Sequence, residues 1–508
     1  MRIGVLDLLT LPARRPAEIV YNVMLTKQYA SVMPQAIAVW CRRRGHETFY
    51  GAYWGLGDPR RLLPTDLDLV FVASYTQASA LAYALAKLYR RDGVRTVLGG
   101  PHAKAFPEDA RRFFDLVVGD CDERLVADIL AGDWGRGTIV SGDAITELPS
   151  VAERMPEIRR SAFLRDRPYA STTIPLLASV GCPYGCDFCV DWDRPYRQLP
   201  LDRLAADLRT VASEIPGAMV SFHDPNFAVR FDAVLDVLDA LPRSRRPPYI
   251  MESSLAVVKG ARAARLAATN CAMAAPGIES WTDYGAKAGT PSLAGATKVA
   301  RLIEHFHELR PHVPYLQANF LFGGEDDAGD EPVELTRTFM SRTPFVWPVV
   351  NIPHPFGGTP LFARTLAEGR ILEALPFSFY YSPYLATVPR HYEPVEYYAK
   401  LIELFEYFTA PGMLLRRLRS TASPFIRAAH VVRTRVKRRR LAMFRRLHAQ
   451  LVTDRQFRAF HAGRSPDLPA TYRETYTCLL GPFGALMTDA DAMPVLGGGA
   501  AGGVVAAS

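Results

Sequence analysis

The sequence predicts an α/β protein with a doubly wound parallel sheet first, a partial (β/α)6 barrel second and a helical region last. Two series of short apolar runs alternate with helical segments, and the strand pattern fades beyond about residue 383. Parallel neighbours need crossover connections, so strands that alternate with helices indicate parallel sheets. At 508 residues, the chain also exceeds what one hydrophobic core normally organises.

The first series occupies residues 1–136. Apolar runs predict strands at 2–9, 48–54, 68–76, 96–100 and 115–119, with helices at 30–44, at 78–91 and from about Pro107. In such a sheet, a small ligand binds at the carboxyl ends of the strands. Residues 137–172 lose this periodicity and carry scattered proline, serine and charge, so we expect a linker there.

The second series occupies residues 173–382. Its expected strands are 173–181, 218–224, 248–254, 271–280, 315–324 and 345–353, and helices such as 201–214 and 292–309 separate them. Six strands with intervening helices fit a barrel or partial barrel. The chemistry of a barrel lies on the loops that follow its strands.

Residues 383–495 are expected to be helical and contain a strongly basic stretch. Residues 411–450 hold twelve Lys and Arg and no acidic residue. Apolar residues recur there at helical spacing, at Ala429, Val432, Val436, Met443, Leu447 and Leu451. The segment 415–446 could dock on the barrel, contact an anionic membrane surface or bind nucleic acid. Aromatic residues are not interleaved with the arginines, which argues against nucleic acid.

The sequence suggests neither a membrane-spanning helix nor a secretion signal. No apolar run approaches the roughly 20 residues of a spanning helix, and MRIGVLDLL lacks the basic and apolar regions of a signal peptide. We therefore expect a cytoplasmic protein. The low-complexity residues 496–508 are expected to be disordered.

Three of the seven cysteines, Cys182, Cys186 and Cys189, stand in GCPYGCDFC directly after the first strand of the second series. Thiolates are soft ligands for zinc or iron-sulfur clusters. A structural zinc takes four ligands, and no fourth Cys or His follows at finger or ribbon spacing. Three thiolates can instead hold a cubane cluster and leave one iron open. A zinc site and three unrelated cysteines remain the alternatives.

This loop resembles the hallmark of the radical S-adenosylmethionine (SAM) superfamily, Cys-x3-Cys-x2-Cys with an aromatic residue before the last cysteine. Phe188 occupies that aromatic position. The resemblance implies that the three cysteines bind a 4Fe-4S cluster, with the amino and carboxylate groups of SAM on the fourth iron. It also implies reductive cleavage of SAM to methionine and a 5'-deoxyadenosyl radical.

Further segments follow in the order that the superfamily uses. FHDPNF (222–227) resembles a segment that contacts the SAM amino group, which implies a role for Asp224. Glu252 and Glu279 fall where relatives face the ribose and methionine moieties, and Asn319 and Gly323 fall where the adenine packs. The turn PHPFGGTPLF (353–362) also resembles many relatives. Structural roles remain open: a solvent-facing strand end for Glu279, a turn cap for Asn319 and a tight turn for the glycines.

A parallel sheet before such a barrel resembles the cobalamin-binding subgroup, which includes class B methyltransferases and has a Rossmann-like first domain. TVLGGPHA (96–103) is similar to its Gly-Gly-Pro-His segment. The resemblance implies cobalamin contacts by Ser74, Thr76, Gly99 and Gly100, where missing Cβ atoms permit close approach.

Two features of this chain depart from that subgroup. The first strand is followed by LDLLTLPARR, without the Asp-x-His-x-x-Gly that supplies a cobalt ligand in many cobalamin domains. In addition, Cys121 stands inside the acidic segment 119–123, where relatives carry glycine. A degenerate, cofactor-free domain is the alternative. His46 and His102 are expected to be ordinary surface or loop histidines.

The resemblance implies an enzyme that transfers a methyl group from methylcobalamin to an unactivated carbon through a 5'-deoxyadenosyl radical. Expected partners are a small-molecule or natural-product substrate and an electron donor such as flavodoxin or ferredoxin. A peripheral membrane contact through the basic helix is considered, and nucleic acid is not expected. The alternatives are a cobalamin-dependent cyclisation, rearrangement or oxidation, and an iron-sulfur sensor that never cleaves SAM.

Overall fold

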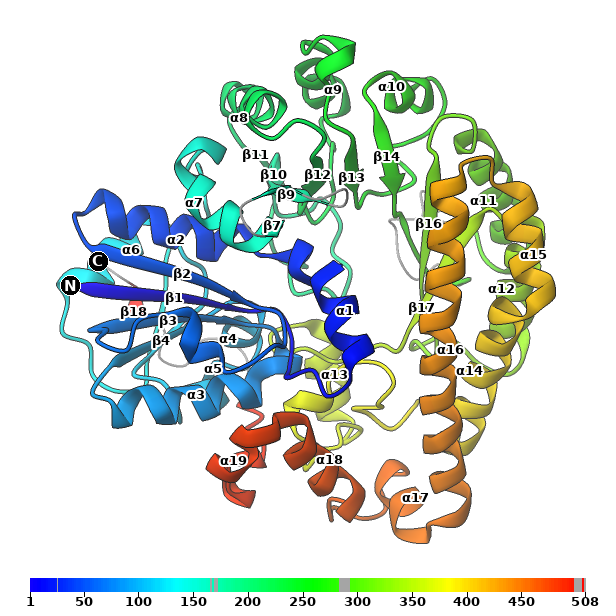
Figure 1. The fold of residues 1–508 in the computed structure, drawn as a ribbon. Helices are drawn as coiled ribbons and strands as arrows, with labels where there is room; N and C mark the ends of the chain where they lie inside the picture. The colour runs from blue at the N-terminus through cyan, green and yellow to red at the C-terminus, as the bar shows by residue number, and fades with distance from the viewer. Residues whose placement is uncertain (25, 165–166, 169–171, 283–292, 498–504, 507–508) are drawn as a thin grey trace.

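The predicted fold class is confirmed by the structure, a computed structural model that describes residues 1–24, 26–164, 167–168, 172–282, 293–497 and 505–506. Two parallel sheets stand side by side, and a helical region closes the far side of the second sheet (Figure 1).

The N-terminal sheet has the strand order β18-β6-β5-β4-β3-β1-β2, and all its pairings are parallel. Its strands are β1 (Arg2–Leu8), β2 (Glu47–Tyr53), β3 (Leu69–Ser74), β4 (Arg95–Gly99), β5 (Leu116–Val118), β6 (Thr138–Ser141) and the short β18 (Val505–Ala506). Helices α2 (Val32–Arg43) and α6 (Glu123–Ala131) cover one face, and α3 (Ser79–Arg91) covers the other. The short α4 (Pro101–Ala105) and α5 (Pro107–Ala110) follow β4. Because the order reverses between β1 and β3, a crevice is expected at their carboxyl ends.

The second sheet is an open, partial barrel with β9 at one end and β17 at the other. Along the sheet run β9 (Thr173–Leu176), β12 (Met219–Phe222), β13 (Tyr249–Met251), β14 (Cys271–Ala274), β16 (Tyr315–Leu321) and β17 (Val346–Asn351). The connecting helices are α8 (Leu201–Glu214), α9 (Phe231–Asp239), α10 (Arg262–Ala268), α11 (Gly295–Leu309) and α12 (Glu331–Arg342), and α13 (Pro360–Ala367) follows β17. A further short strand, β15 (Gly277–Glu279), pairs with β16.

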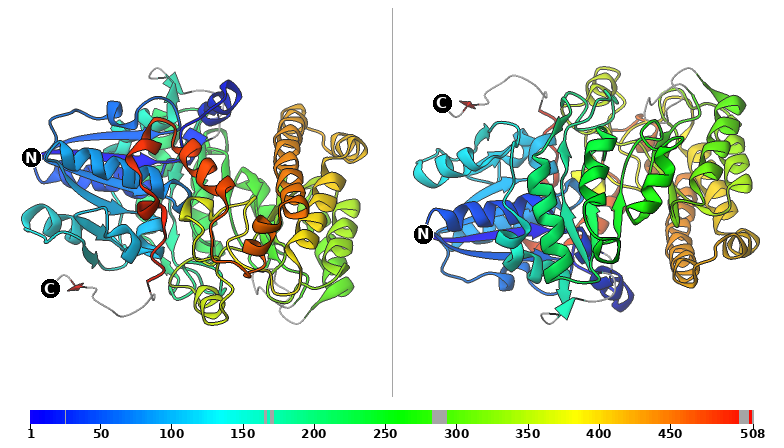
Figure 2. Two further views of the ribbon diagram at one scale, coloured as in Figure 1. Left: turned by 90° about the horizontal axis from the view of Figure 1, so that it is seen from below. Right: turned by 90° about the horizontal axis from the view of Figure 1, so that it is seen from above.

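The C-terminal region is helical, as the sequence predicts. It consists of α14 (Pro394–Thr409), α15 (Pro411–Ser420), the long α16 (Pro424–Thr453), α17 (Arg455–His461), α18 (Ala470–Leu480) and α19 (Asp489–Ala492). The last helices return to the N-terminal domain (Figure 2), where Lys87 of α3 pairs with Asp491 and Arg112 donates to the carbonyl of Met493 at 2.8 Å. The chain therefore closes on itself through its C-terminal segment.

The segment expected to be a linker, 137–172, is partly structured. It contains β6 and α7 (Val151–Ala162) as well as the two-residue pair β7 (Phe163–Leu164) and β8 (Arg167–Pro168), while 165–166 and 169–171 lie outside the described residues. A four-residue strand is too short to show periodicity, and Pro156 inside α7 weakens the helical pattern. The Ser150 and Glu153 capping box was the readable signal for this helix.

The basic helix is confirmed as α16, but the predicted apolar face is partly wrong. Val432 and Met443 are exposed, and the buried positions are Ile426, His430, Thr434, Leu441, Phe444, Leu447 and Leu451. Polar His430 and Thr434 belong to the packed face because α16 lies on α14 and the inner faces of β16 and β17. Hydropathy alone therefore predicted the wrong side of this helix to be buried at some positions.

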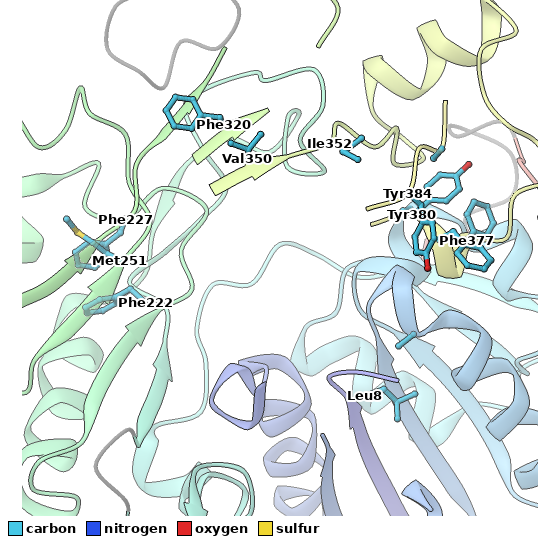
Figure 3. Packing of buried hydrophobic residues seen from close by; sticks show 14 of the residues in the cluster. Leu8, Phe222, Phe227, Met251, Phe320, Val350, Ile352, Phe377, Tyr380 and Tyr384 are labelled. Carbon is cyan, nitrogen blue, oxygen red and sulfur yellow. The ribbon is translucent and has the colours of Figure 1, made fainter. Parts of the chain in front are cut away.

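One hydrophobic cluster joins the two sheets. Leu8 of β1, Phe377 and Tyr380 of the loop after α13, and Phe222 of β12 all belong to it (Figure 3). Among the described residues, none of the helices combines the length and the apolar character needed to cross a membrane.

Candidate functional site

A cavity of about 630 Å³ lies between the N-terminal sheet and the barrel. Its walls include Asp7, Ser74 and Gly99 from the strand ends at the reversal of the sheet, and Gly181, Arg194 and His223 from the barrel. Pockets of roughly 300–1,000 Å³ are typical for small-molecule and cofactor sites. The crevice expected from the strand order is therefore a real cavity that both domains line.

Three of the four residues expected to contact cobalamin line this cavity. Ser74, Gly99 and Gly100 do so, whereas Thr76 is buried at the start of the turn after β3 and does not. A Cβ atom on Gly99 would meet no atom within 4 Å, so the backbone there faces open space. Gly100 has φ +91°, and its Cβ would lie 3.1 Å from the backbone of Ser74, so this turn requires glycine.

Asp7 is a cavity residue that our sequence reasoning missed. Its side chain is 1% exposed and accepts a hydrogen bond from the Ser31 N–H at 2.8 Å. Burial raises the pKa of Asp7 to about 7, although the hydrogen bonds from Ser31 lower it. The signal was a lone carboxylate near the end of an apolar strand, where perturbed groups often mark a site.

The cysteine loop leaves the barrel between two short strands, β10 (Ser179–Val180) and β11 (Arg197–Gln198), which pair antiparallel. Cys182 and Cys186 are buried, and Cys189 and the neighbouring Phe188 are half-buried. The Cys182 N–H donates to the carbonyl of Arg194 at 3.0 Å, and the Cys189 N–H donates to that of Cys186 at 3.0 Å. These hydrogen bonds make the loop compact and join its two ends.

The turn after β17 holds the outer side of this loop. The indole N–H of Trp192 donates to the carbonyl of Gly358 at 2.9 Å, and Arg364 of α13 pairs with Asp187 at 2.7 Å. The Leu361 N–H also donates to the carbonyl of Asp187 at 3.0 Å. The segment 353–362 thus positions the cysteines through the loop between them.

Two ion pairs join the same loop to the N-terminal domain. Lys104 of α4 pairs with Asp191 at 3.2 Å, and Arg194 pairs with Asp120, which follows β5. All four side chains are half-buried at the cavity wall. The cysteine loop therefore closes one side of the cavity that opens from the sheet edge.

The residues of the loop fit an iron-sulfur cluster by their chemistry. Three thiols that stand on one short loop, two of them buried, are the donor set that such a cluster takes. Across the described ranges, no three His, Cys, Asp or Glu side chains converge as the ligands of one metal ion. A cluster needs less convergence, because each thiolate binds a different iron atom.

Asp224 lies behind the cysteine loop. It is 2% exposed, accepts from Ser179 Oγ at 2.5 Å and accepts from the Ala178 N–H at 3.0 Å. Burial raises the pKa of Asp224 to about 6, and the hydrogen bond from Ser179 opposes that shift. The structure thus gives this carboxylate a role in fixing the start of the loop, and its proposed contact with SAM stays a prediction.

His223, which precedes Asp224, faces the cavity. Its Nε2 atom is sealed from solvent and has no hydrogen-bond partner among the described residues. Burial lowers the pKa of His223 to about 4, and nearby Arg154 lowers it further, so the ring is neutral at physiological pH. His223 therefore lines the cavity as a neutral imidazole, with one buried nitrogen that no described residue bonds.

Three other predicted SAM residues lie near the carboxyl ends of barrel strands. Glu252 is exposed after β13, and Glu279 ends β15 with φ +65°, a conformation that non-glycine residues adopt mainly where function or packing demands it. Asn319 accepts from Gln317 Nε2 at 2.8 Å and donates to the carbonyl of Ala275 at 3.3 Å. Glu252 thus follows β13, Glu279 is the last residue of β15, and Asn319 lies inside β16.

Gly323 serves the turn after β16. It has φ +77°, and a Cβ atom there would lie 2.0 Å from the Tyr397 ring. Its N–H donates to Asp327 at 2.9 Å, so that donor is already used. The turn therefore requires glycine at this position. The adenine contact of Gly323 stays a prediction.

His102 is not the surface or loop histidine that we expected. It is fully buried, and its Nε2 lies 2.5 Å from Tyr83 Oη, which donates to Asp109 at 2.6 Å. Burial lowers the pKa of His102 to about 3. The histidine of the Gly-Gly-Pro-His segment thus anchors α4 in the core behind the glycines.

Comparisons with known proteins agree with this architecture. One similar structure is that of a radical SAM methyltransferase, TsrM of Kitasatospora setae, solved with cobalamin and a [4Fe-4S] cluster bound. The alignment covers 72% of this chain and 78% of that chain, with a TM-score of 0.50 and 14% sequence identity. This chain has the fold of a radical SAM methyltransferase. The resemblance to the cobalamin-binding radical SAM enzymes is therefore confirmed at the level of the fold.

Two curated proteins of Chlorobaculum tepidum are also similar in sequence. One is a bacteriochlorophyllide d C-8(2)-methyltransferase, 24% identical over 70% of this chain and 80% of that protein. The other is a bacteriochlorophyllide d C-12(1)-methyltransferase, 24% identical over 58% of this chain and 65% of that protein. No protein-family model matches the sequence.

Proposed function

We propose that this protein is a cobalamin-dependent radical SAM C-methyltransferase that acts on a small-molecule substrate. The cavity carries this proposal: the reversal edge of a doubly wound sheet forms one wall, and a three-cysteine loop forms another. Sequence similarity to two methyltransferases and the fold of a third support the same activity.

The chain's own residues would hold two resident groups on either side of this cavity. Cys182, Cys186 and Cys189 would bind a 4Fe-4S cluster, and the edge at Ser74, Gly99 and Gly100 would receive cobalamin. When bound, the reduced cluster supplies an electron for SAM cleavage and methylcobalamin supplies the methyl group.

The protein contributes alignment and the exclusion of water. The ion pairs Lys104–Asp191 and Arg194–Asp120 fix the cysteine loop against the sheet edge, which keeps the distance between the two sites constant. Burial of Cys182 and Cys186 keeps solvent from the loop interior. Asp224 holds the first turn of the loop through Ser179.

The products of SAM test this function without knowledge of the substrate. Anaerobically reconstituted protein with cobalamin, reductant and SAM should release 5'-deoxyadenosine and S-adenosylhomocysteine, the products of the two roles that SAM plays. Cys186→Ala should abolish 5'-deoxyadenosine, whereas Cys478→Ala, an exposed cysteine outside the loop, should retain it.

Two other outcomes favour different functions. Release of 5'-deoxyadenosine without S-adenosylhomocysteine would favour a cyclisation, rearrangement or oxidation. Release of neither product from protein with a full cluster would favour a sensor. Once a substrate is known, a product heavier by one methylene group would identify methyl transfer directly.

A further inference from the structure

The basic helix α16 carries a row of three cations, Arg433, Lys437 and Arg440, that face inward. They recur at helical spacing on one side, whereas Arg435 and Arg439 between them are exposed. Arg433 donates to Tyr315 Oη at 2.5 Å and to Gln317 Oε1 at 2.7 Å, both on β16. The row therefore begins on the inner face of the barrel sheet.

Lys437 and Arg440 continue this row along α16, beside α14 and the loop after α13. Lys437 Nζ lies 5.8 Å from the centre of the Phe405 ring of α14. Burial lowers the pKa of Arg440, and the nearby Tyr381 and Tyr384, in the loop after α13, raise it. Tyr21 of α1 (Pro16–Met24) acts on Arg440 in the same way, from the N-terminal domain.

Arg433, the first member of the row, also lies near the segment that packs against the other end of the barrel sheet. The 3-10 turn η1 (Thr26–Tyr29), which follows α1, contacts β9 at one end of the sheet, and α16 covers β16 and β17 at the other (Figure 1). Between them, burial raises the pKa of Tyr29, and of the nearby charges Arg433 lowers this pKa and Glu252 raises it. Gln317 also connects Arg433 to Asn319, one of the predicted SAM residues.

No carboxylate neutralises this row within the described part of the chain. None of its three members forms an ion pair there, and Arg440 Nη1 is sealed from solvent without a hydrogen-bond partner. Burial, with the charges of Arg440 and Arg433, lowers the pKa of Lys437 to about 7. Adjacent partly buried cations without an anion are costly, so their arrangement calls for a negative ligand.

We propose that Arg433, Lys437 and Arg440 bind an anionic group of the substrate and orient it in the barrel. The assignment of this anion to the substrate rests on the proposed function. The site lies on the last two strands, whereas the cysteine loop and the cavity lie beside β9 and β12, so the site is separate from the walls that would hold the cluster and cobalamin. The substrate class is thus a small molecule that carries a carboxylate or a similar anion.

Lys437 reports binding directly, because an anion beside it stabilises its charged form. The charged groups that face it are Arg433 and Arg440 of its own helix, and the Phe405 ring faces it from α14. We would measure the acetylation rate of Lys437 at pH 8 by peptide mass spectrometry in the full-length protein. Benzoate should slow this rate at least fivefold, whereas the uncharged methyl benzoate should change it less than twofold.

Variants separate a binding role from a structural one. Arg440→Gln should remove most of the protection by benzoate, and Arg439→Gln, the exposed neighbour, should retain it. Lys437→Met should raise the Tm of the protein, because repulsion within the row falls, yet the further Tm increase caused by benzoate should disappear.

Three results would overturn the proposal: no protection by benzoate, equal protection by methyl benzoate, or the same protection by SAM or cobalamin alone. The last result would assign the anion to a cofactor. The assay needs neither reductant nor cluster, so its failure differs from failure of the proposed function, which appears as absent 5'-deoxyadenosine.

Discussion

Gly181 sets the geometry of the cysteine loop at its first residue. It has φ +67°, and a Cβ atom there would lie 2.3 Å from the carbonyl oxygen of Pro195, at the other end of the loop. Left-handed backbone costs a residue with a side chain roughly 1–2 kcal/mol before any clash is counted. The close approach of the two ends of the loop therefore depends on glycine.

Gly181→Ala should lower the iron bound per chain several-fold, because the base of the loop must open. Gly185→Ala is the matched control, since its Cβ would meet only the carbonyl oxygen of Trp192 at 3.8 Å. Iron and sulfide are measured after anaerobic reconstitution. Equal iron in the two variants would show that the loop tolerates the added atom.

Asp7 makes stability depend on pH. Its folded pKa, about 7, lies above its unfolded value of roughly 4, so it is protonated in both states at low pH and costs nothing there. As pH rises from about 4 to about 7, the unfolded state gains the free energy of ionisation. Above that range the cost is constant, at most about 4 kcal/mol for three pKa units.

Asp7→Asn should therefore raise Tm more at pH 8 than at pH 5, because the amide carries no charge to desolvate. Asp133→Asn, at an exposed position, is the control and should shift Tm little at either pH. Thermal unfolding followed by circular dichroism at the two pH values measures the difference. A gain that is the same at both would contradict a buried, titrating Asp7.

At the scale of elements, the cysteine loop and the N-terminal sheet meet through charge. Arg194 and Asp120 are both half-buried, so their attraction is less screened than that of a surface pair. This pair joins the loop directly to the segment after β5, which lines the cavity.

Asp120→Asn should weaken cobalamin retention by about fivefold, the effect of roughly 1 kcal/mol, while iron content stays unchanged. Glu147→Gln is the control, because it pairs with Arg203 at the surface and neither residue lines the cavity. Bound cobalamin is quantified by absorbance after gel filtration. If iron fell together with cobalamin, the pair would be holding the loop itself rather than the contact between domains.

The elements show which parts of the fold could be predicted. Long periodic segments such as α8 were predicted with the right bounds, 201–214. The predicted strands end one to six residues too late because apolar runs continue into the buried loops after them, as in the five residues beyond Leu176 of β9. β6 and α7 were missed because one is too short for a pattern and the other contains a proline.

The candidate site could be predicted only where its residues form a short motif in the sequence. The three cysteines and the Gly99-Gly100 turn carry local signals, and the structure places them around or beside one cavity. Asp7, His223 and the inward row of α16 depend on contacts between segments far apart in the chain. No local sequence pattern indicates which face of a helix will pack against distant parts of the chain.

At the scale of the whole molecule, the two sheets and the helical region act as one frame around the cavity between the domains. The continuous core holds the sheets together, the C-terminal helices return to α3, and α16 closes the barrel opposite η1. The cavity between the domains suits the proposed resident groups, and the proposed anion site lies on β16 beside α16. This arrangement is the physical basis for a reaction in which several partners must be aligned away from water.

The most direct test of the account is metal analysis of oxygen-free, reconstituted protein, combined with electron paramagnetic resonance of its reduced form. The account predicts about four iron and four sulfide per chain, a signal that changes when SAM is added, and loss of both in Cys186→Ala. Zinc in place of iron, or a cluster that is unchanged in Cys186→Ala, would contradict it.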